Sequence, residues 1–304
     1  MKKRGINVIL LLAVFAAISG FIPRGQCSAS EGVSVMQDQR SPAGHSHEAA
    51  RSKDEDILVE IKTEPGKIVA GSPTTLRLSI TDREGKPVTG LTIMHDRILH
   101  VVIAGQDFRT FAHIHPDDFE KVTPALIKTG RFLLRYAFPK AGRYIIGVDF
   151  AVNDQPFSRH FTVDVLGETA MGPPEKDLSR EKRFGGYDVA LSSRPETITA
   201  GREVMLLYIV SMNGRPVKDL EPYLSAAMHL SIISGDLRYF IHTHGELPGM
   251  PPMEPEHMHM TLPNKFGPEI DVHTVFPASG VYQIFGEFRH HGKVIVTSFM
   301  VDVK

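Results

Sequence analysis

The stretch HVVIAGQDFRTFAHIH, residues 100–115, has the pattern of two short strands on either side of a turn. β-branched and aromatic residues are frequent on both sides of Gly-Gln-Asp, which is typical of a β-hairpin. A second stretch, HLSIISGDLRYFIHTH at residues 229–244, repeats the arrangement. Each stretch has one histidine at its start and a His-x-His at its end. We therefore expect two hairpins, each of which carries three histidines.

The two stretches belong to an internal repeat that covers most of the chain. His100, His113 and His115 align with His229, His242 and His244 at a constant offset of 129 residues. Further on, YAFPKAGRYIIGVDF aligns with TVFPASGVYQIFGEF at an offset of 138, so the second copy carries nine extra residues. The insertion falls within or near GELPGMPPMEPEHMHMTLPN.

Each copy shows several short β-type runs separated by Gly, Pro and Asp, and no long amphipathic helical pattern competes with them. This spacing favours an antiparallel β-sandwich. We expect an all-β protein with two tandem sandwich domains, 56–166 and 187–304, joined by a linker at 167–186.

The N-terminus predicts export. MKKR followed by INVILLLAVFAAISGFI has the charge and apolar run of a secretory signal peptide, so we interpret 1–27 as a signal peptide or N-terminal anchor. Residues 28–55 are polar and predict a flexible tether. The protein is then periplasmic or otherwise extracytoplasmic. Cys27 is the sole cysteine, which excludes an intrachain disulfide and leaves lipid attachment at this position as an alternative.

The hairpin geometry predicts that the histidines converge. Two-residue loops at Gln106-Asp107 and Gly235-Asp236 would pair His100 with His113 and His229 with His242. Directly paired side chains share a face, and alternation adds the histidine two positions further on. Since the opposite face has the apolar residues of a core, the histidine face is expected to be free for a ligand. Three imidazoles on one face predict a metal site in each repeat, with these ligands: His100, His113 and His115 in the first, and His229, His242 and His244 in the second.

The metal is not fixed by the imidazoles, which suit Zn, Cu, Ni or Fe. The insertion adds thioethers, soft ligands that favour Cu(I), and exported Met/His tracts suggest copper handling. Copper is therefore the first expectation and zinc the second, although a loop whose methionines merely pack on the domain is an open alternative. The additional candidate ligands are His95, Met94, Met228, Met250, Met253, His257, Met258, His259 and Met260, followed by His273, His290 and His291 on later strands.

The pattern His, Gly/Asp turn, His-x-His and then FPxxGxY resembles exported bacterial YtkA-like domains, over about residues 57–304. The resemblance implies Ig-like β-sandwiches in metal contexts, particularly copper. It points to a binding or accessory protein whose partner is a membrane or periplasmic metalloenzyme or another copper-handling protein. The resemblance covers both histidine triads, but Pro116 follows the first His-x-His as in the family whereas Gly245 follows the second.

Two other functions remain open. A three-histidine site with a free position can activate water, and Glu120 follows His115 at a spacing like that of cupins, so a metalloenzyme is one alternative. An Ig-like interaction module with structural histidines is the other. The sequence shows no Gly-x-Ser-x-Gly motif or phosphate loop, which favours a non-enzymatic protein. A formal net charge of −1 speaks against a nucleic-acid partner.

Overall fold

The structure is a computed structural model that describes residues 34–35, 39–40, 56–250 and 262–304. The chain is nearly all β, which confirms the predicted fold class of tandem Ig-like sandwiches. The predicted signal peptide, Cys27 and most of the predicted tether lie outside the described residues. So do five of the predicted ligands in the insertion: Met253, His257, Met258, His259 and Met260.

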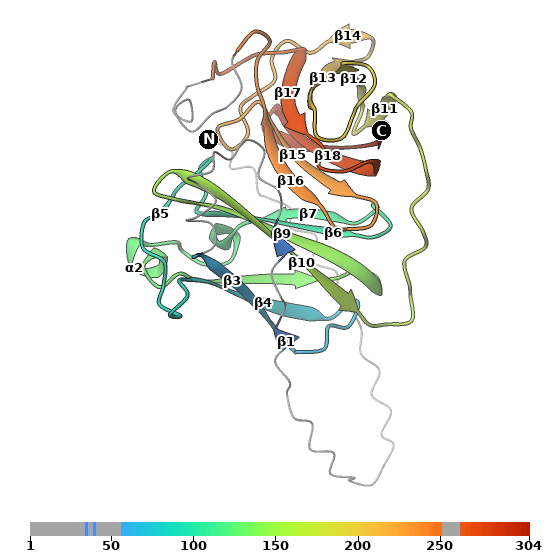
Figure 1. The fold of residues 1–304 in the computed structure, drawn as a ribbon. Coiled ribbons are helices and arrows are strands. Elements are labelled where there is room, and N and C mark those ends of the chain that lie inside the picture. The colour runs from blue at the N-terminus through green and yellow to red at the C-terminus, as the bar shows by residue number, and fades with distance from the viewer. Residues whose placement is uncertain (1–33, 36–38, 41–55, 251–261) are drawn as a thin grey trace, which may run out of the picture. The chain divides into compact units, whose positions relative to one another are not determined.

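Repeat 1 (56–166) is built from two antiparallel sheets (Figure 1). The first sheet consists, in spatial order, of β1 (Ser34–Val35), β3 (Leu58–Glu64), β4 (Pro73–Thr81) and β8 (Arg131–Ala137). The second consists of β2 (Gln39–Arg40), β10 (Gln155–Val165), β9 (Gly142–Val152), β6 (Leu99–Gly105) and β7 (Phe111–Ile114), with β5 (Leu91–Thr92) also paired to β9. Strands β1 and β2 fall inside the segment that we expected to be a tether. Two short helices, η1 (Pro116–Asp118) and α2 (Pro124–Ile127), lie between β7 and β8.

Repeat 2 (187–304) has the same two-sheet plan. One sheet consists of β11 (Glu181–Phe184), β12 (Tyr187–Arg194), β13 (Glu203–Met212), β14 (Arg215–Pro216) and β17 (Glu269–Val275), which pairs with β13. The other consists of β16 (Phe240–Gly245), β15 (Met228–Ser234), β18 (Gly280–His290) and β19 (Lys293–Val303). Strand β11 begins within the segment that we predicted as the linker.

Each repeat has its own hydrophobic core between its two sheets. Alternate residues of β4 and β13 are buried, as expected for strands with one face on a core. Val101 and Ile103 enter the core of repeat 1, and Leu230 and Ile232 enter that of repeat 2. The predicted core face of each hairpin is therefore confirmed along its strands. Phe108 and Leu237, which we also expected on that face, lie instead in a third apolar cluster.

A third apolar cluster joins the two repeats, which belong to one compact unit, Gly32–Lys304. It contains Val102, Ala104 and Phe108 together with Phe240 and Phe285. Every residue of β6 and of β15 is buried, so both faces of these strands are covered. The expectation that the histidine face is free for a ligand is wrong, because the histidine-bearing sheets of the two repeats cover one another there.

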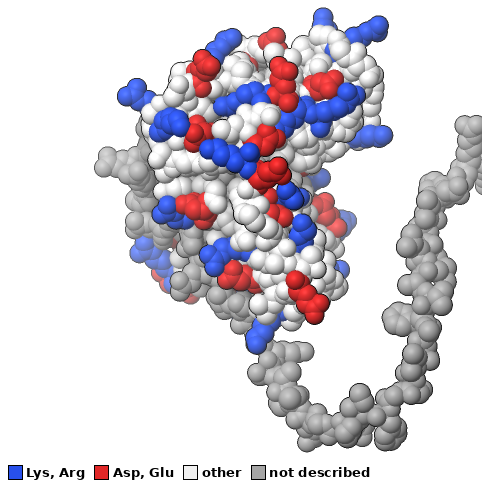
Figure 2. All heavy atoms as spheres, turned by 90° about the vertical axis from the view of Figure 1, so that its right-hand side faces the viewer, with Lys and Arg blue, Asp and Glu red and all other residues white. Residues whose placement is uncertain are grey.

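The described surface carries charges of both signs. On the face in Figure 2, Lys and Arg side chains are interspersed with Asp and Glu. Among the described residues, no helix has the length and apolarity needed to cross a bilayer.

Candidate metal centre

The register of the histidine hairpins differs from the predicted one. Val102, not His100, is opposite His113 in β6–β7, and His229 is opposite His244 in β15–β16. In repeat 1 the Phe108 N–H donates to the Gly105 carbonyl, and the ladder closes when the Gly105 N–H donates to the Thr110 carbonyl. The loop between Gly105 and Thr110 therefore has four residues, 106–109, instead of the two that we predicted.

Left-handed residues in the turns explain the longer loops. Phe108 and Leu237 have φ of 53° and 60°, and both side chains are buried in the cluster between the repeats. Asp107 and Asp236 stabilise the turns, because each carboxylate accepts a hydrogen bond from the backbone N–H two residues on. Burial of Phe108 and Leu237 between the repeats thus sets the register. The slip moves each histidine by an even number of residues, so all three stay on one face.

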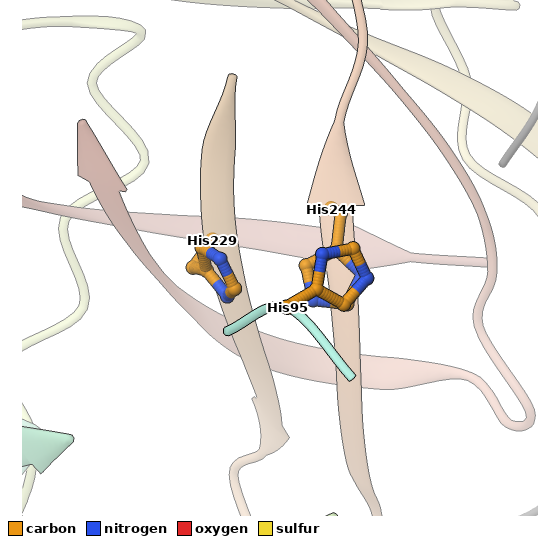
Figure 3. Close-up of side chains that lie close together, drawn as sticks. All are labelled: His95, His229 and His244. Atoms are coloured by element: carbon orange, nitrogen blue, oxygen red, sulfur yellow. The ribbon is translucent and has the colours of Figure 1, made fainter. Parts of the chain in front are cut away.

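Seven histidines from both repeats come together where the sheets meet. Their ligand atoms form three groups in which every pair lies within 4.8 Å: His100, His113 and His115; His100, His229 and His242; and His95, His229 and His244. The second and third groups combine residues of both repeats, and Figure 3 shows His95 of repeat 1 beside His229 and His244 of repeat 2. The two predicted ligand sets thus lie together in one shared cluster.

In repeat 1, hydrogen bonds leave one ring nitrogen of His100 and one of His113 directed into the cluster. His100 Nε2 lies 3.0 Å from the Met94 carbonyl, which only accepts, so this nitrogen carries the proton and Nδ1 has the lone pair. His113 Nδ1 lies 2.6 Å from Glu287 Oε2 of repeat 2. His100 Nδ1 and His113 Nε2 then face one another at 3.1 Å.

Repeat 2 repeats this arrangement. His229 Nε2 donates to the Leu224 carbonyl at 3.2 Å, and His242 Nδ1 lies 3.0 Å from Asp149 Oδ2 of repeat 1. The remaining nitrogens, His229 Nδ1 and His242 Nε2, are 3.4 Å apart. Each repeat therefore supplies a carboxylate that orients a histidine of the other.

The third histidine of each hairpin has a buried nitrogen with no partner. His115 Nδ1 is 3.3 Å from Asp118 Oδ2, while its Nε2 is buried and makes no hydrogen bond. His244 Nε2 is buried and unpaired as well. A buried polar atom without a partner is costly unless something binds it.

These features fit a metal ion. Two ligands at 2.0–2.1 Å from a tetrahedral ion lie about 3.3 Å apart, and the facing nitrogens are separated by 3.1 and 3.4 Å. Carboxylates or carbonyls on the outer ring nitrogens are the usual partners of metal-bound histidines. The imidazole set suits copper or zinc.

Burial keeps six of these imidazoles neutral, which is the state that binds metals. It lowers the pKa of His95 and of His115 to about 4. It also holds the pKa of His100, His113, His229 and His244 well below the usual value, and neighbouring imidazoles lower these values further. Burial raises the pKa of Glu287 to about 8. Without an ion, a proton on Glu287 lets His113 donate through Nε2 to His100. An ion between the two imidazoles takes the place of that proton.

The cluster lies on a pseudo-two-fold axis. His100 and His229 are equivalent and stack with ring centroids 5.5 Å apart. The bonds from His113 to Glu287 and from His242 to Asp149 are reciprocal, as in a two-fold symmetric dimer interface.

The structure separates the weaker candidates. Met228 is fully buried in the core of repeat 2, and Met250 packs against that core. The Met94 side chain is buried, and its carbonyl lies 3.0 Å from His100 Nε2. His273 hydrogen-bonds to Glu203 and belongs to none of the three groups found among the described residues. His290 and His291 form a separate group with Asp219, in which both His290 nitrogens are occupied, by Tyr187 and Asp219.

The sequence prediction missed Asp149 and Glu287. They occupy equivalent positions in the aligned GVDF and FGEF segments, 138 residues apart. An acidic residue kept in both copies within an otherwise apolar strand was the available signal. Their strands pair with the first histidine of each hairpin, His100 opposite Asp149 and His229 opposite Glu287.

A family model matches both repeats, over residues 51–167 and 182–304. The chain belongs to the DUF8832 family. That family is described as a domain of unknown function, and its two matches coincide with the two repeats. No curated protein matches the chain significantly.

Among solved structures, the Escherichia coli adhesin FdeC aligns with 81% of this chain and 64% of its own, at 13% identity and a TM-score of 0.23. Salmonella α-2-macroglobulin aligns with 82% of this chain and 17% of its own, at 9% identity and a TM-score of 0.25. The FN1–FN3 domains of chicken CNTN1 align with 78% of this chain and 62% of their own, at 8% identity and a TM-score of 0.21. The chain thus spans less than two thirds of each of these proteins. Such low scores support no inference about function.

Proposed function

We propose that this DUF8832 protein is an exported, extracytoplasmic metal-binding protein that holds copper at the histidine cluster between its repeats. Storage, resistance or delivery to a metalloenzyme or copper-handling partner are the roles that such binding would serve. Zinc is the second candidate ion.

One observation carries the proposal. In each repeat, two imidazoles have their outer nitrogens hydrogen-bonded and their inner nitrogens face one another at 3.1 and 3.4 Å. Beside each pair lies a buried, unpaired Nε2, of His115 or of His244. Two buried nitrogens without a partner, each beside a facing pair of imidazoles, are costly for a protein that binds nothing there.

Copper is preferred to zinc for two reasons taken from the sequence. The histidine pattern resembles that of YtkA-like domains, which occur in copper contexts. The Met/His-rich insertion of repeat 2 would add soft ligands for Cu(I). The N-terminal apolar segment supports export.

Binding is favoured over catalysis. Glu120, which the cupin-like spacing made a candidate ligand, accepts a hydrogen bond from the Leu133 N–H at 3.0 Å. It belongs to none of the ligand groups found among the described residues. We therefore treat the protein as non-enzymatic.

Metal analysis of the protein isolated from its own extracytoplasmic compartment tests the proposal. We expect copper in the purified protein, and copper in preference to zinc after dialysis against both ions. Zinc found in place of copper would overturn the choice of copper and would support a metal centre at the histidine cluster. Protein that contains no transition metal and takes up none at micromolar concentration would overturn the proposal.

A further inference from the structure

The two halves of the histidine cluster differ at one position. His95 and Leu224 are equivalent residues, 129 positions apart, in matching tight turns. Their φ angles are 49° and 47°, and those of the following residues, Asp96 and Ser225, are 63° and 59°. The backbone is thus the same in both turns, but only repeat 1 places an imidazole there.

The two turns meet at the pseudo-two-fold axis. Ser225 Oγ donates to Asp96 Oδ1 at 2.7 Å, a contact between equivalent positions. From this turn the His95 ring reaches His244 and His229 of the other repeat, at centroid distances of 3.7 and 5.5 Å (Figure 3). His95 offers one ring nitrogen to the ligand group that it forms with His229 and His244.

We propose that the two halves are unequal: His95 of repeat 1 joins the group of His229 and His244, and His242, whose Nε2 faces His229 Nδ1 at 3.4 Å, is recruited as a fourth imidazole, whereas His100, His113 and His115 form a three-imidazole site. This inference rests on the proposed metal-binding function. Four ligands fill a tetrahedral ion, while three leave a position open. The first site retains its ion, and the second exchanges its ion with an incoming ligand or partner.

Two adjustments accompany binding. The ligand atom of His242 groups with those of His100 and His229, so it must move toward His95 and His244 to share their ion. The His95 and His244 rings are stacked at an interplanar angle of 26°, whereas ligand lone pairs lie in the ring planes. One ring must turn edge-on for both to reach the same ion.

The test is a competition titration of the full chain with a chelator, with Cu²⁺ and Zn²⁺ in separate experiments. Wild-type protein should show a tight and a weaker ion. His95→Leu should weaken the tight ion by about tenfold or more and leave the other unchanged. Leu224→His should tighten the weaker ion. Leucine already occupies this turn conformation at position 224, so His95→Leu suits the backbone. His273→Leu, which removes an imidazole bonded to Glu203, is the matched control.

The outcomes separate this inference from the proposed function. Two ions with affinities that His95→Leu does not alter would overturn the inequality and leave metal binding intact. Equal weakening of both ions, together with a lower melting temperature, would show that His95 acts only through the fold and would also overturn it. Absence of binding by the wild-type chain would instead overturn the proposed function.

Discussion

At the scale of single residues, the centre depends on buried histidines that carboxylates orient. His113 is fully buried and its carboxylate partner Glu287 nearly so. The same holds for His242 and Asp149. Because each carboxylate comes from the other repeat, each ligand is oriented only when the repeats are docked.

Removing these carboxylates should weaken metal binding without removing a ligand. For Glu287→Gln and Asp149→Asn we expect affinity to fall about 10- to 100-fold, because the imidazoles lose their charged partners. A chelator competition measures this. Glu203→Gln, which changes the partner of His273 away from the cluster, is the control and should have no effect. Affinities equal to that of the control would contradict the orienting role.

Acid should destabilise the metal-free protein. The folded-state pKa of His95 and His115 is lowered to about 4, from an unfolded value of about 6.5. The unfolded chain therefore binds more protons below pH 6.5, so stability is complete above that pH and is lost as pH falls toward 4. Each histidine contributes a slope of about 1.4 kcal/mol per pH unit in this window. Urea denaturation with a chelator present, from pH 7 to 4, measures the slope. A flat profile would contradict the burial of neutral imidazoles.

The sequence predicted the six hairpin histidines because strand alternation and internal repetition can both be seen in the amino-acid sequence itself. It did not predict Asp149 and Glu287 as part of the site, because their role depends on a partner in the other repeat. His95 was only a supplementary candidate for the same reason: its neighbours in space, His229 and His244, are more than a hundred residues away.

At the scale of elements, turn geometry and sheet packing decide the register. Periodicity gave the faces of β6 and β7 correctly, but the loop length depended on where the side chains of Phe108 and Leu237 are buried. That place lies between the repeats. The sequence of one hairpin alone therefore cannot predict the loop length.

The close packing of the repeats makes a glycine of β9 critical. A Cβ on Gly147 would lie 2.2 Å from the Phe240 ring of the other repeat. Gly147→Ala should therefore destabilise the protein by about 1–3 kcal/mol through overpacking. Urea denaturation measures the change. Gly172→Ala, where a Cβ meets nothing within 4 Å, is the control. Equal stability of the two variants would show that the repeats are not packed in this way.

At the scale of the whole molecule, two sandwiches with separate cores form one centre at their shared face. Sequence repetition predicted two domains and a ligand set in each, and the spacing of short β-type runs and turns predicted an all-β fold. The contact between the two histidine-bearing sheets was not predictable. The apolar residues beside the histidines would have the same sequence pattern whether their face were exposed to solvent or packed in a domain interface. An ion held by both repeats should also stabilise the docked arrangement, since ligands that bind only the folded state raise its stability.

A copper titration of the full chain beside His113→Ala/His242→Ala, with bound metal counted after dialysis, tests whether these histidines hold the metal. We expect about two ions per wild-type chain and loss of both in the double variant, because each substitution removes one of the facing nitrogens. Folding of the variant is checked by circular dichroism. Unchanged stoichiometry in a folded double variant would contradict the claim that these histidines hold the metal.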